Sequence, residues 1–171
     1  TGTGQSMYEI EKYNEVNIMG TTYLLQILAN SKHSIKKMVI ASSRAIYGEG
    51  KYCDLENRIQ YPEQRLESDM QKGNFNLKCP LNSVELTALA TDENSKTHPS
   101  SIYGLNKQQQ ENMIMLMGKS LAIPAVAFRY QNVYGPGQSL SNPYTGILSV
   151  FSTRILNGNE LDIYEDGLQS R

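Results

Sequence analysis

Apolar residues recur at helical spacing over two long stretches of the chain. The first stretch covers about 7–30, and Ser6 and Glu9 at its start form the S-x-x-E pattern typical of a helix N-terminus. The second stretch covers 101–121, where Ser100 or Ser101 is a candidate helix cap. The pattern therefore predicts two long amphipathic helices, the first beginning at about Met7.

Two short apolar runs have the length and composition of strands. They cover 37–41, where the side chains become hydroxylic at Ser42-Ser43, and 124–130. Such runs are typical of strands buried on both faces of a sheet. Because these strands alternate with the two helices, we expect βαβ units, a parallel sheet and an α/β fold.

The remaining segments carry weaker signals. Residues 48–100 show little periodicity and many turn-forming residues, so most of this stretch is predicted to be surface loop. A loop of that length inside a domain usually marks a functional or inserted segment. Beyond the second strand, a turn-rich stretch leads to a predicted helix over 145–156 and a short strand over 161–164.

Composition and charge narrow the class of partner. The chain has 171 residues, enough for one domain, and its 16 basic and 17 acidic residues leave a net charge of −1. That balance gives no electrostatic reason to expect nucleic acid or an anionic membrane, and no apolar run reaches the length of a membrane span. With only two cysteines and two scattered histidines, we expect a cytoplasmic protein without a disulfide framework or a metal site.

Polar side chains follow each predicted strand, where ligands bind in open parallel sheets. Tyr103 and Lys107 lie one turn apart on the second helix, which places them on one face. A neighbouring ammonium stabilises a phenolate, and the phenol can then exchange a proton with a substrate hydroxyl, with Ser43 bonding the same oxygen. The alternative is that this pair belongs to an ordinary solvated helix face. Asn17 is likewise open to a structural or a substrate-proximal interpretation.

The order of the motifs makes the interpretation more specific. Four motifs occur in order along the chain, namely Asn17-Ile18-Met19-Gly20-Thr21 with Leu24-Leu25, Ala41-Ser42-Ser43-Arg44-Ala45-Ile46-Tyr47-Gly48, Tyr103-Gly104-Leu105-Asn106-Lys107 and Arg129-Tyr130-Gln131-Asn132-Val133-Tyr134-Gly135-Pro136. With these motifs the chain resembles the extended short-chain dehydrogenase/reductase family, and within it the NAD-dependent nucleotide-sugar epimerases and dehydratases.

The resemblance implies a role for each matching residue. It places Ser43, Tyr103 and Lys107 as the catalytic group, with NAD as cofactor and a nucleotide-linked sugar as substrate. Cofactor contacts are expected from Ser42, Tyr103, Lys107, Tyr130 and Gln131, and substrate contacts from Ser43, Arg44 and Asn132. It also implies a homodimer formed through a four-helix bundle of the helices at 7–30 and 101–121.

The expected fold is a Rossmann-like, doubly wound parallel sheet that lacks the N-terminal dinucleotide-binding strand-turn-helix and the C-terminal part. No glycine-rich turn following a strand is present, and family members run to roughly twice this length, so we expect an interior fragment. It would be a single α/β domain fragment over 1–171. Residues 1–130 would form the Rossmann-like portion with a loop insertion at 49–100, and 131–171 would begin the substrate-binding region.

One position favours a particular reaction. Dehydratases that resemble this chain carry Asp-Glu directly after the catalytic hydroxyl residue, whereas this chain has Arg44-Ala45 there. The resemblance therefore favours epimerisation at C4 through a 4-keto sugar. A reductase or dehydratase of the same family, or a non-catalytic dimerisation module, remains an alternative. Residues 11–22 and 138–145 are most similar to thymidine-linked rhamnose epimerases.

Overall fold

The computed structural model describes residues 2–139 and 146–168 of the chain. The chain divides into two compact units by its internal contacts. Unit 1 is formed by Thr1–Gly48 and Thr97–Val133, and unit 2 by Glu49–Lys96 and Tyr134–Arg171. The segment predicted to be an insertion thus contributes to a unit other than the one that holds the two long helices.

Unit 1 is built on two parallel strands, β1 (Met38–Ser43) and β5 (Ala125–Tyr130). The register runs from Met38 opposite Ala125 to Ser43 opposite Tyr130, so both strands end at the same edge. Both predicted strands are confirmed, and β1 extends through the two serines that follow its apolar run. The polar residues after each strand consequently begin side by side.

The first predicted helix starts later than expected and is not regular. A 3-10 turn comes first, the helix then begins at Ile10 instead of Met7, and it passes through a π-helical segment. In order, these elements are η1 (Gln5–Met7), α1 (Ile10–Tyr13), η2 (Asn14–Met19) and α2 (Gly20–Asn30). Ser6 does not cap this helix, because its hydroxyl donates to the Thr3 carbonyl and accepts the backbone N–H of Tyr103.

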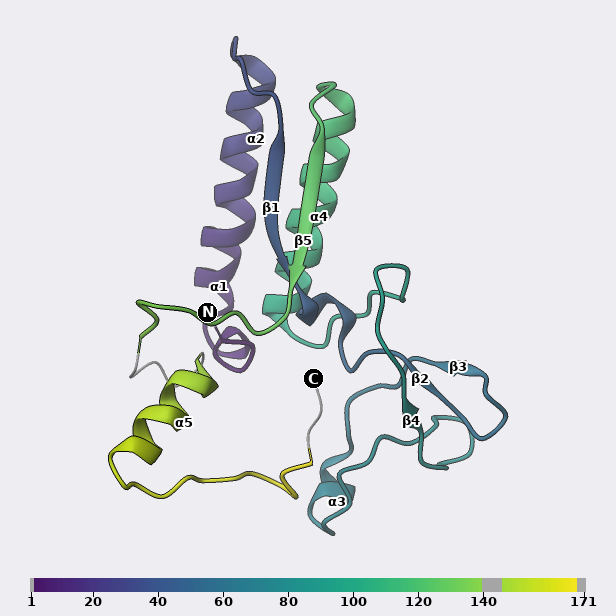
Figure 1. Cartoon of the computed structure of the whole chain (residues 1–171). Helices are drawn as coiled ribbons and strands as arrows, with labels where there is room; N and C mark the ends of the chain where they lie inside the picture. The colour runs from purple at the N-terminus through teal and green to yellow at the C-terminus, as the bar shows by residue number, and fades with distance from the viewer. Residues whose placement is uncertain (1, 140–145, 169–171) are drawn as a thin grey trace. The chain divides into compact units, whose positions relative to one another are not determined.

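The second predicted helix is confirmed as α4 (Ile102–Ser120), and the Ser101 hydroxyl caps it by accepting the Gly104 N–H at 3.0 Å. Figure 1 shows α2 and α4 on the same side of β1 and β5. The core between them consists of buried apolar side chains from both helices, β1 and the turn after α4, namely Leu25, Leu28, Met38, Ile114 and Ile123.

The opposite face of the strand pair is open within the described residues. Val39 on β1 is 59% exposed and Phe128 on β5 is 47% exposed. The expectation that these strands are buried on both faces is therefore wrong for the described chain. The cause is that both long helices pack on one side, so only alternate residues of β1 enter the core.

Polar side chains join η2 to α4. The Gln110 amide donates to the Asn17 carbonyl at 2.9 Å and to the Thr21 hydroxyl at 2.7 Å, and the Asn106 amide donates to the Asn14 side chain at 2.7 Å. A π-helical segment displaces the backbone groups of a helix from their usual partners. Here one such carbonyl, that of Asn17, serves a structural contact.

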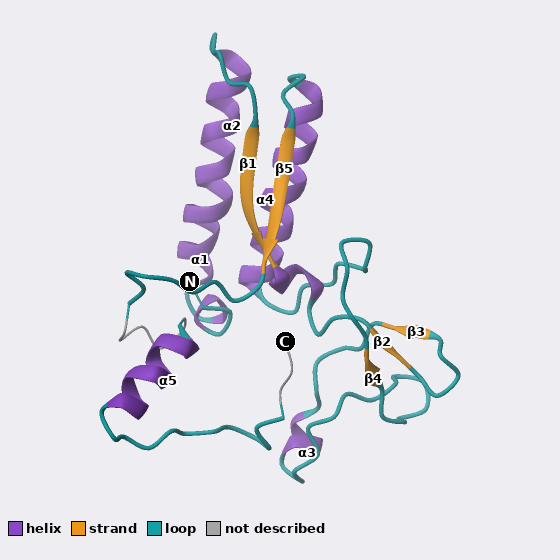
Figure 2. Ribbon diagram, in the orientation of Figure 1, coloured by secondary structure: helices purple, strands orange, loops and turns teal. Residues whose placement is uncertain are grey.

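Unit 2 contains short elements, drawn with the rest of the secondary structure in Figure 2. Its antiparallel sheet has the strand order β3-β2-β4, and two helices complete it. The bounds are β2 (Tyr52–Cys53), β3 (Ile59–Gln60), α3 (Glu67–Met70), β4 (Thr87–Ala88) and α5 (Ile147–Leu156). Most of residues 48–100 is loop or turn, as predicted, and the strands that interrupt it are only two residues long.

The Asp54 carboxylate organises the turn between β2 and β3. It accepts the backbone N–H groups of Glu56 and Arg58, and the side chains of Arg58 and Gln60. Although burial opposes ionisation, these bonds lower the pKa of Asp54 to about 2. A single carboxylate thus closes the hairpin that local hydrophobic patterning does not reveal.

Two expectations near the C-terminal end have different outcomes. The helix over 145–156 is confirmed as α5, except that position 145 lies outside the described residues, as does most of 138–145. The strand over 161–164 is wrong, because these residues form no strand. None of the helices within 2–139 and 146–168 is long and apolar enough to cross a membrane.

Helix α4 has two glycines at which neighbouring segments leave no space for a side chain. A Cβ at Gly104 would lie 2.5 Å from the Ala45 carbonyl oxygen, and one at Gly118 would lie 2.8 Å from the Ala125 Cβ. Distances this short leave no room for a methyl group beside rigid backbone. The absence of a side chain at Gly104 therefore lets the first turn of α4 touch the segment after β1.

We expect Gly104→Ala to destabilise the intact protein by about 2 kcal/mol, because the added methyl overpacks this contact. Gly20→Ala is the matched control, since nothing lies within 4 Å of a Cβ at that helical position. The control should be neutral or stabilising by up to about 1 kcal/mol, because alanine favours helix. Urea denaturation checks both variants, and equal effects of the two substitutions would contradict the packing argument.

Candidate active site

Ser43 stands at the junction of β1 and the 3-10 turn η3 (Arg44–Tyr47). Its hydroxyl accepts the Ala45 N–H at 3.1 Å, which caps η3 and fixes the serine side chain. The residue is buried, and Arg44 after it is half-buried. The carboxyl end of β1 thus presents a hydroxyl whose oxygen is already oriented by its own backbone.

Tyr103 and Lys107 lie on the first two turns of α4. The Lys107 ammonium is 5.9 Å from the centroid of the Tyr103 ring. Lys107 is half-buried, and this burial lowers the pKa of its ammonium group. The two groups predicted from their spacing are therefore neighbours, with the ammonium over the face of the Tyr103 ring.

The Ser43 turn and the Tyr103 helix are packed against each other. The contact is the close approach of Gly104 to the Ala45 carbonyl, one residue from Tyr103 and two residues from Ser43. Both segments belong to unit 1, as do all the other predicted site residues, Ser42, Arg44, Lys107, Tyr130, Gln131 and Asn132. The chain thereby brings the predicted catalytic serine, tyrosine and lysine into one region of one unit.

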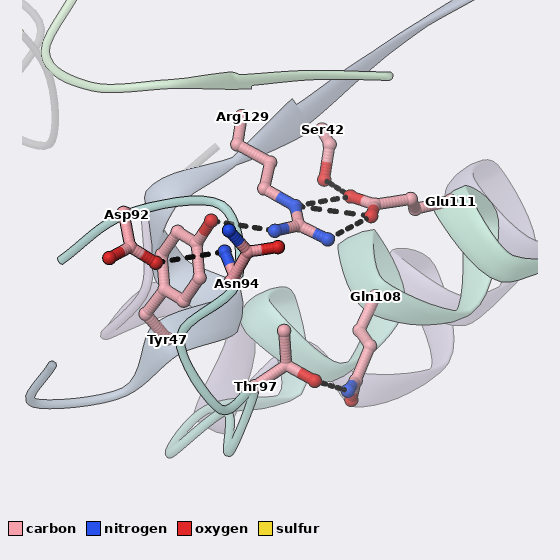
Figure 3. A network of polar contacts seen from close by, with 8 residues as sticks. All are labelled: Ser42, Tyr47, Asp92, Asn94, Thr97, Gln108, Glu111 and Arg129. Atoms are coloured by element: carbon pink, nitrogen blue, oxygen red, sulfur yellow. Dashed lines mark hydrogen bonds and ion pairs between the residues drawn. The ribbon is translucent and has the colours of Figure 1, made fainter. Parts of the chain in front are cut away.

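A carboxylate that sequence reasoning did not single out joins α4 to both strands (Figure 3). Glu111 accepts the Ser42 hydroxyl from β1 at 2.6 Å. From β5, the Arg129 guanidinium donates to the same carboxylate from Nε and from Nη2, the latter at 2.6 Å. Arg129 also donates to the Tyr47 hydroxyl at 2.6 Å and lies over its ring.

This network favours the charged forms of Glu111 and Arg129. Burial alone would raise the pKa of Glu111, but the hydrogen bonds from Arg129 and Ser42 outweigh that effect and lower it. The same bond to Glu111 raises the pKa of Arg129, so both groups are charged at neutral pH. Glu111 and Arg129 therefore form a nearly buried, hydrogen-bonded ion pair near the carboxyl ends of β1 and β5.

The predicted ligand-binding residues differ in their exposure to solvent. Ser42 is only 4% exposed, and its hydroxyl has Glu111 as a partner, so its contact with a cofactor stays a prediction. Tyr130 is exposed, and its ring stacks on Phe128 with centroids 5.6 Å apart. Gln131 and Asn132 follow it and are exposed. These three side chains are available to a ligand at the end of β5.

Two more residues that the sequence did not assign to the site contact Tyr103 directly. The Ser6 hydroxyl accepts its backbone N–H, and the Tyr13 ring meets its ring edge to face. No local pattern links these positions to residue 103, which follows them by about 90 residues. Glu111 could have been found, because it continues the Tyr103–Lys107 spacing by one more turn.

The chain is similar to known proteins in sequence and in structure. Residues 83–171 match the NAD dependent epimerase/dehydratase family. The chain is 34% identical to a dTDP-L-rhamnose 4-epimerase from Burkholderia thailandensis over 172 aligned residues, which span 100% of this chain and 46% of that protein.

Solved structures show the same relationship. A UDP-N-acetylglucosamine 4-epimerase from Methanobrevibacter ruminantium, in complex with UDP-N-acetylmuramic acid, superposes with a TM-score of 0.68 at 27% identity, covering 99% of this chain and 42% of that one. A UDP-glucose 4-epimerase from Thermotoga maritima with UDP-glucose gives 0.67 at 25%, covering 98% and 42%.

The chain belongs to the NAD dependent epimerase/dehydratase family, and its parallel sheet is part of that family's Rossmann-like α/β fold. It spans somewhat less than half the length of these relatives. The resemblance inferred from the motifs around Ser43, Tyr103 and Arg129 is thus confirmed at the level of the family.

We expect Glu111→Gln to destabilise the intact protein by roughly 3 kcal/mol at pH 7, because it leaves Arg129 without a carboxylate. Since the folded pKa of Glu111 lies below its ordinary value of 4.5, the carboxylate stabilises the protein above that pH and loses its effect as pH falls through the folded value. Denaturation curves at pH 7 and near pH 3 should therefore show the gap to wild type narrowing in acid.

The exposed Glu15 supplies the matched control, and Glu15→Gln should stay within about 0.5 kcal/mol of wild type. A gap between wild type and Glu111→Gln that is the same at both pH values would show that charge is not what Glu111 contributes.

Proposed function

We propose that this chain carries the proton-handling site of an NAD-dependent enzyme that epimerises a nucleotide-linked sugar at C4. The observation that carries this proposal is the Lys107 ammonium lying 5.9 Å from the Tyr103 ring, beside the strand ends where Ser43 stands. Family membership supplies the chemical context.

Each of the three residues has a distinct task. The positive charge of Lys107 stabilises the Tyr103 phenolate, and the phenolate removes the proton from the C4 hydroxyl of the sugar. The Ser43 hydroxyl, oriented by its bond to the Ala45 N–H, donates a hydrogen bond to the same sugar oxygen. Loss of this proton together with the C4 hydride converts the alcohol into a 4-keto sugar, and the reverse transfers, made after the ketone has presented its other face, restore the hydroxyl.

The residues present suit NAD. A bound NAD would supply the acceptor for the C4 hydride and the donor for its return. The half-buried Lys107 ammonium and the Tyr103 hydroxyl are donors of the type that hold a ribose diol. The exposed Tyr130 and Gln131, at the end of β5, offer an aromatic ring and an amide beside them. We therefore assign these four residues to the cofactor, and Arg44 and Asn132 with Ser43 to the sugar nucleotide.

The segment after Ser43 supports epimerisation over dehydration. Loss of water from the sugar requires an acid and a base beyond the tyrosine, and the two residues after Ser43 are Arg44 and Ala45. Arg44 keeps its proton and Ala45 has none to give. A reductase or dehydratase of the same family is the second candidate, and net consumption of reduced cofactor or formation of a 6-deoxy sugar would identify it.

The first substrate to test is dTDP-L-rhamnose, because a relative with that activity aligns with the whole chain. UDP-glucose is the second substrate to test, because the similar structure from Thermotoga maritima was solved with UDP-glucose. The cytoplasm is the expected compartment for either substrate.

Replacing the proposed base should abolish turnover. We expect Tyr103→Phe in the intact protein to lower kcat with dTDP-L-rhamnose by about 10²–10⁴-fold, because the proton acceptor is gone. Lys107→Met should do the same, whereas Lys119→Met, on an exposed position of the same helix, should not. The 4-epimer is measured by chromatography or NMR. If folded Tyr103→Phe turns over normally, the site acts differently or is not catalytic.

We also propose that the protein is a homodimer in which the two long helices meet their copies in a four-helix bundle. Large apolar side chains are exposed on both helices of unit 1. Those on η2 and α2 are Val16, Met19, Tyr23, Leu24 and Ile27, and those on α4 include Leu105 and Leu116. Clustered apolar exposure of this kind marks an interaction surface. A second copy offers the same surface, which suits a two-fold interface.

A charge on this surface should disrupt the dimer. We expect Ile27→Lys to shift the intact protein from dimer to monomer in size-exclusion chromatography with light scattering, because an ammonium cannot be buried there unpaired. Ala29→Lys adds the same charge to an exposed position on another face of α2 and should leave the dimer intact. An unchanged mass for both variants would place the interface elsewhere.

A further inference from the structure

The first turn of α4 has a backbone donor that its own cap does not satisfy. The Ser101 hydroxyl accepts the N–H of Gly104, and the Ser101 carbonyl accepts that of Leu105. The N–H of Tyr103 donates instead to the Ser6 hydroxyl at 3.0 Å. A helix start normally takes one capping side chain from the residue just before it. Here a second cap comes from the N-terminal segment, and it acts on the residue that carries the proposed base.

The Ser6 hydroxyl has a fixed direction. It is fully buried, and it donates its own hydrogen to the Thr3 carbonyl at 2.6 Å. With its hydrogen committed to Thr3, the oxygen presents its lone pairs to Tyr103. The bond therefore holds the Tyr103 backbone at one point, and Ser6 cannot rotate away from it without leaving a buried donor unpaired.

The Tyr103 side chain is supported from the same segment. The Tyr13 ring meets the Tyr103 ring edge to face, with centroids 6.3 Å apart and planes at 86°. The buried Tyr13 hydroxyl accepts the Gly2 N–H at 2.9 Å and lies within hydrogen-bond distance of the Gly2 carbonyl and the Gln5 side chain. Tyr13 thereby holds residues 2–5 in place while its ring touches Tyr103.

We propose that Ser6 and Tyr13 are positioning residues for Tyr103, and we call them the Tyr103 brace. Ser6 fixes the backbone of Tyr103, and Tyr13 limits the rotation of its ring, so that the phenol stays beside the Lys107 ammonium. The proposal rests on the proposed function, because it concerns the same proton transfer. Proton transfer requires a heavy-atom distance close to that of a hydrogen bond, so a small displacement of the phenol slows it.

The test uses Ser6→Ala and Tyr13→Leu in the intact protein. The first removes the acceptor of the Tyr103 N–H, and the second removes the ring that meets the Tyr103 ring edge to face. We expect kcat for C4 epimerisation to fall by about tenfold or more with KM for the nucleotide sugar changed less than about twofold, because the brace orients the base without touching substrate. With kcat expressed per folded molecule, a residue that only stabilised the fold would leave both constants unchanged.

Matched controls and a separate readout make the outcomes distinguishable. Tyr8→Leu removes the ring of an exposed tyrosine in the same segment and should leave kcat unchanged. If Tyr103→Phe abolishes turnover while folded Ser6→Ala and Tyr13→Leu keep the wild-type kcat, the brace is overturned and the proposed function stands. If Tyr103→Phe is active, the proposed function fails first. Ser6→Ala removes a single oxygen atom and decides the question alone should Tyr13→Leu not fold.

Discussion

The ion pair between Glu111 and Arg129 is the constraint on which the arrangement of unit 1 depends. Glu111 lies on α4, Arg129 on β5, and the same carboxylate accepts the Ser42 hydroxyl from β1. Apolar contacts such as those of Ile114 tolerate small sliding movements, whereas a carboxylate bound to donors on two strands permits one axial position of the helix. Because a buried pair adds little net stability over apolar packing, its contribution here is chiefly geometric.

Much of the fold of unit 1 was predictable because its elements follow local rules. The strand lengths, the Ser101 cap and the periodicity of α4 all arise within a few residues of one another. The start of the first helix was mispredicted because Ser6, which resembles a local cap, bonds to Tyr103 instead. The small sheet of unit 2 was missed for another reason, since strands of two residues carry no alternation and depend on the hydrogen bonds of Asp54.

The candidate site likewise contains residues that local spacing predicts and residues that only the folded chain brings together. The spacing of Tyr103 and Lys107 is a property of one helix, so the sequence predicts their proximity without any knowledge of the fold. In the sequence, β1 and the whole 49–96 segment separate the brace residues Ser6 and Tyr13 from Tyr103. Only the packed chain places them beside it. Sequence reasoning therefore finds the reacting groups more readily than the residues that hold them.

This division has a chemical consequence. The proposed base, its ammonium partner, the serine and the brace all belong to unit 1, and so does the Glu111–Arg129 pair. Their mutual distances are set by hydrogen bonds and close contacts inside that unit, including the approach of Gly104 to Ala45. Unit 2 contributes none of these groups. The geometry needed for the proposed proton transfer is therefore built within unit 1, so sequence changes in 49–96 should leave these distances in place.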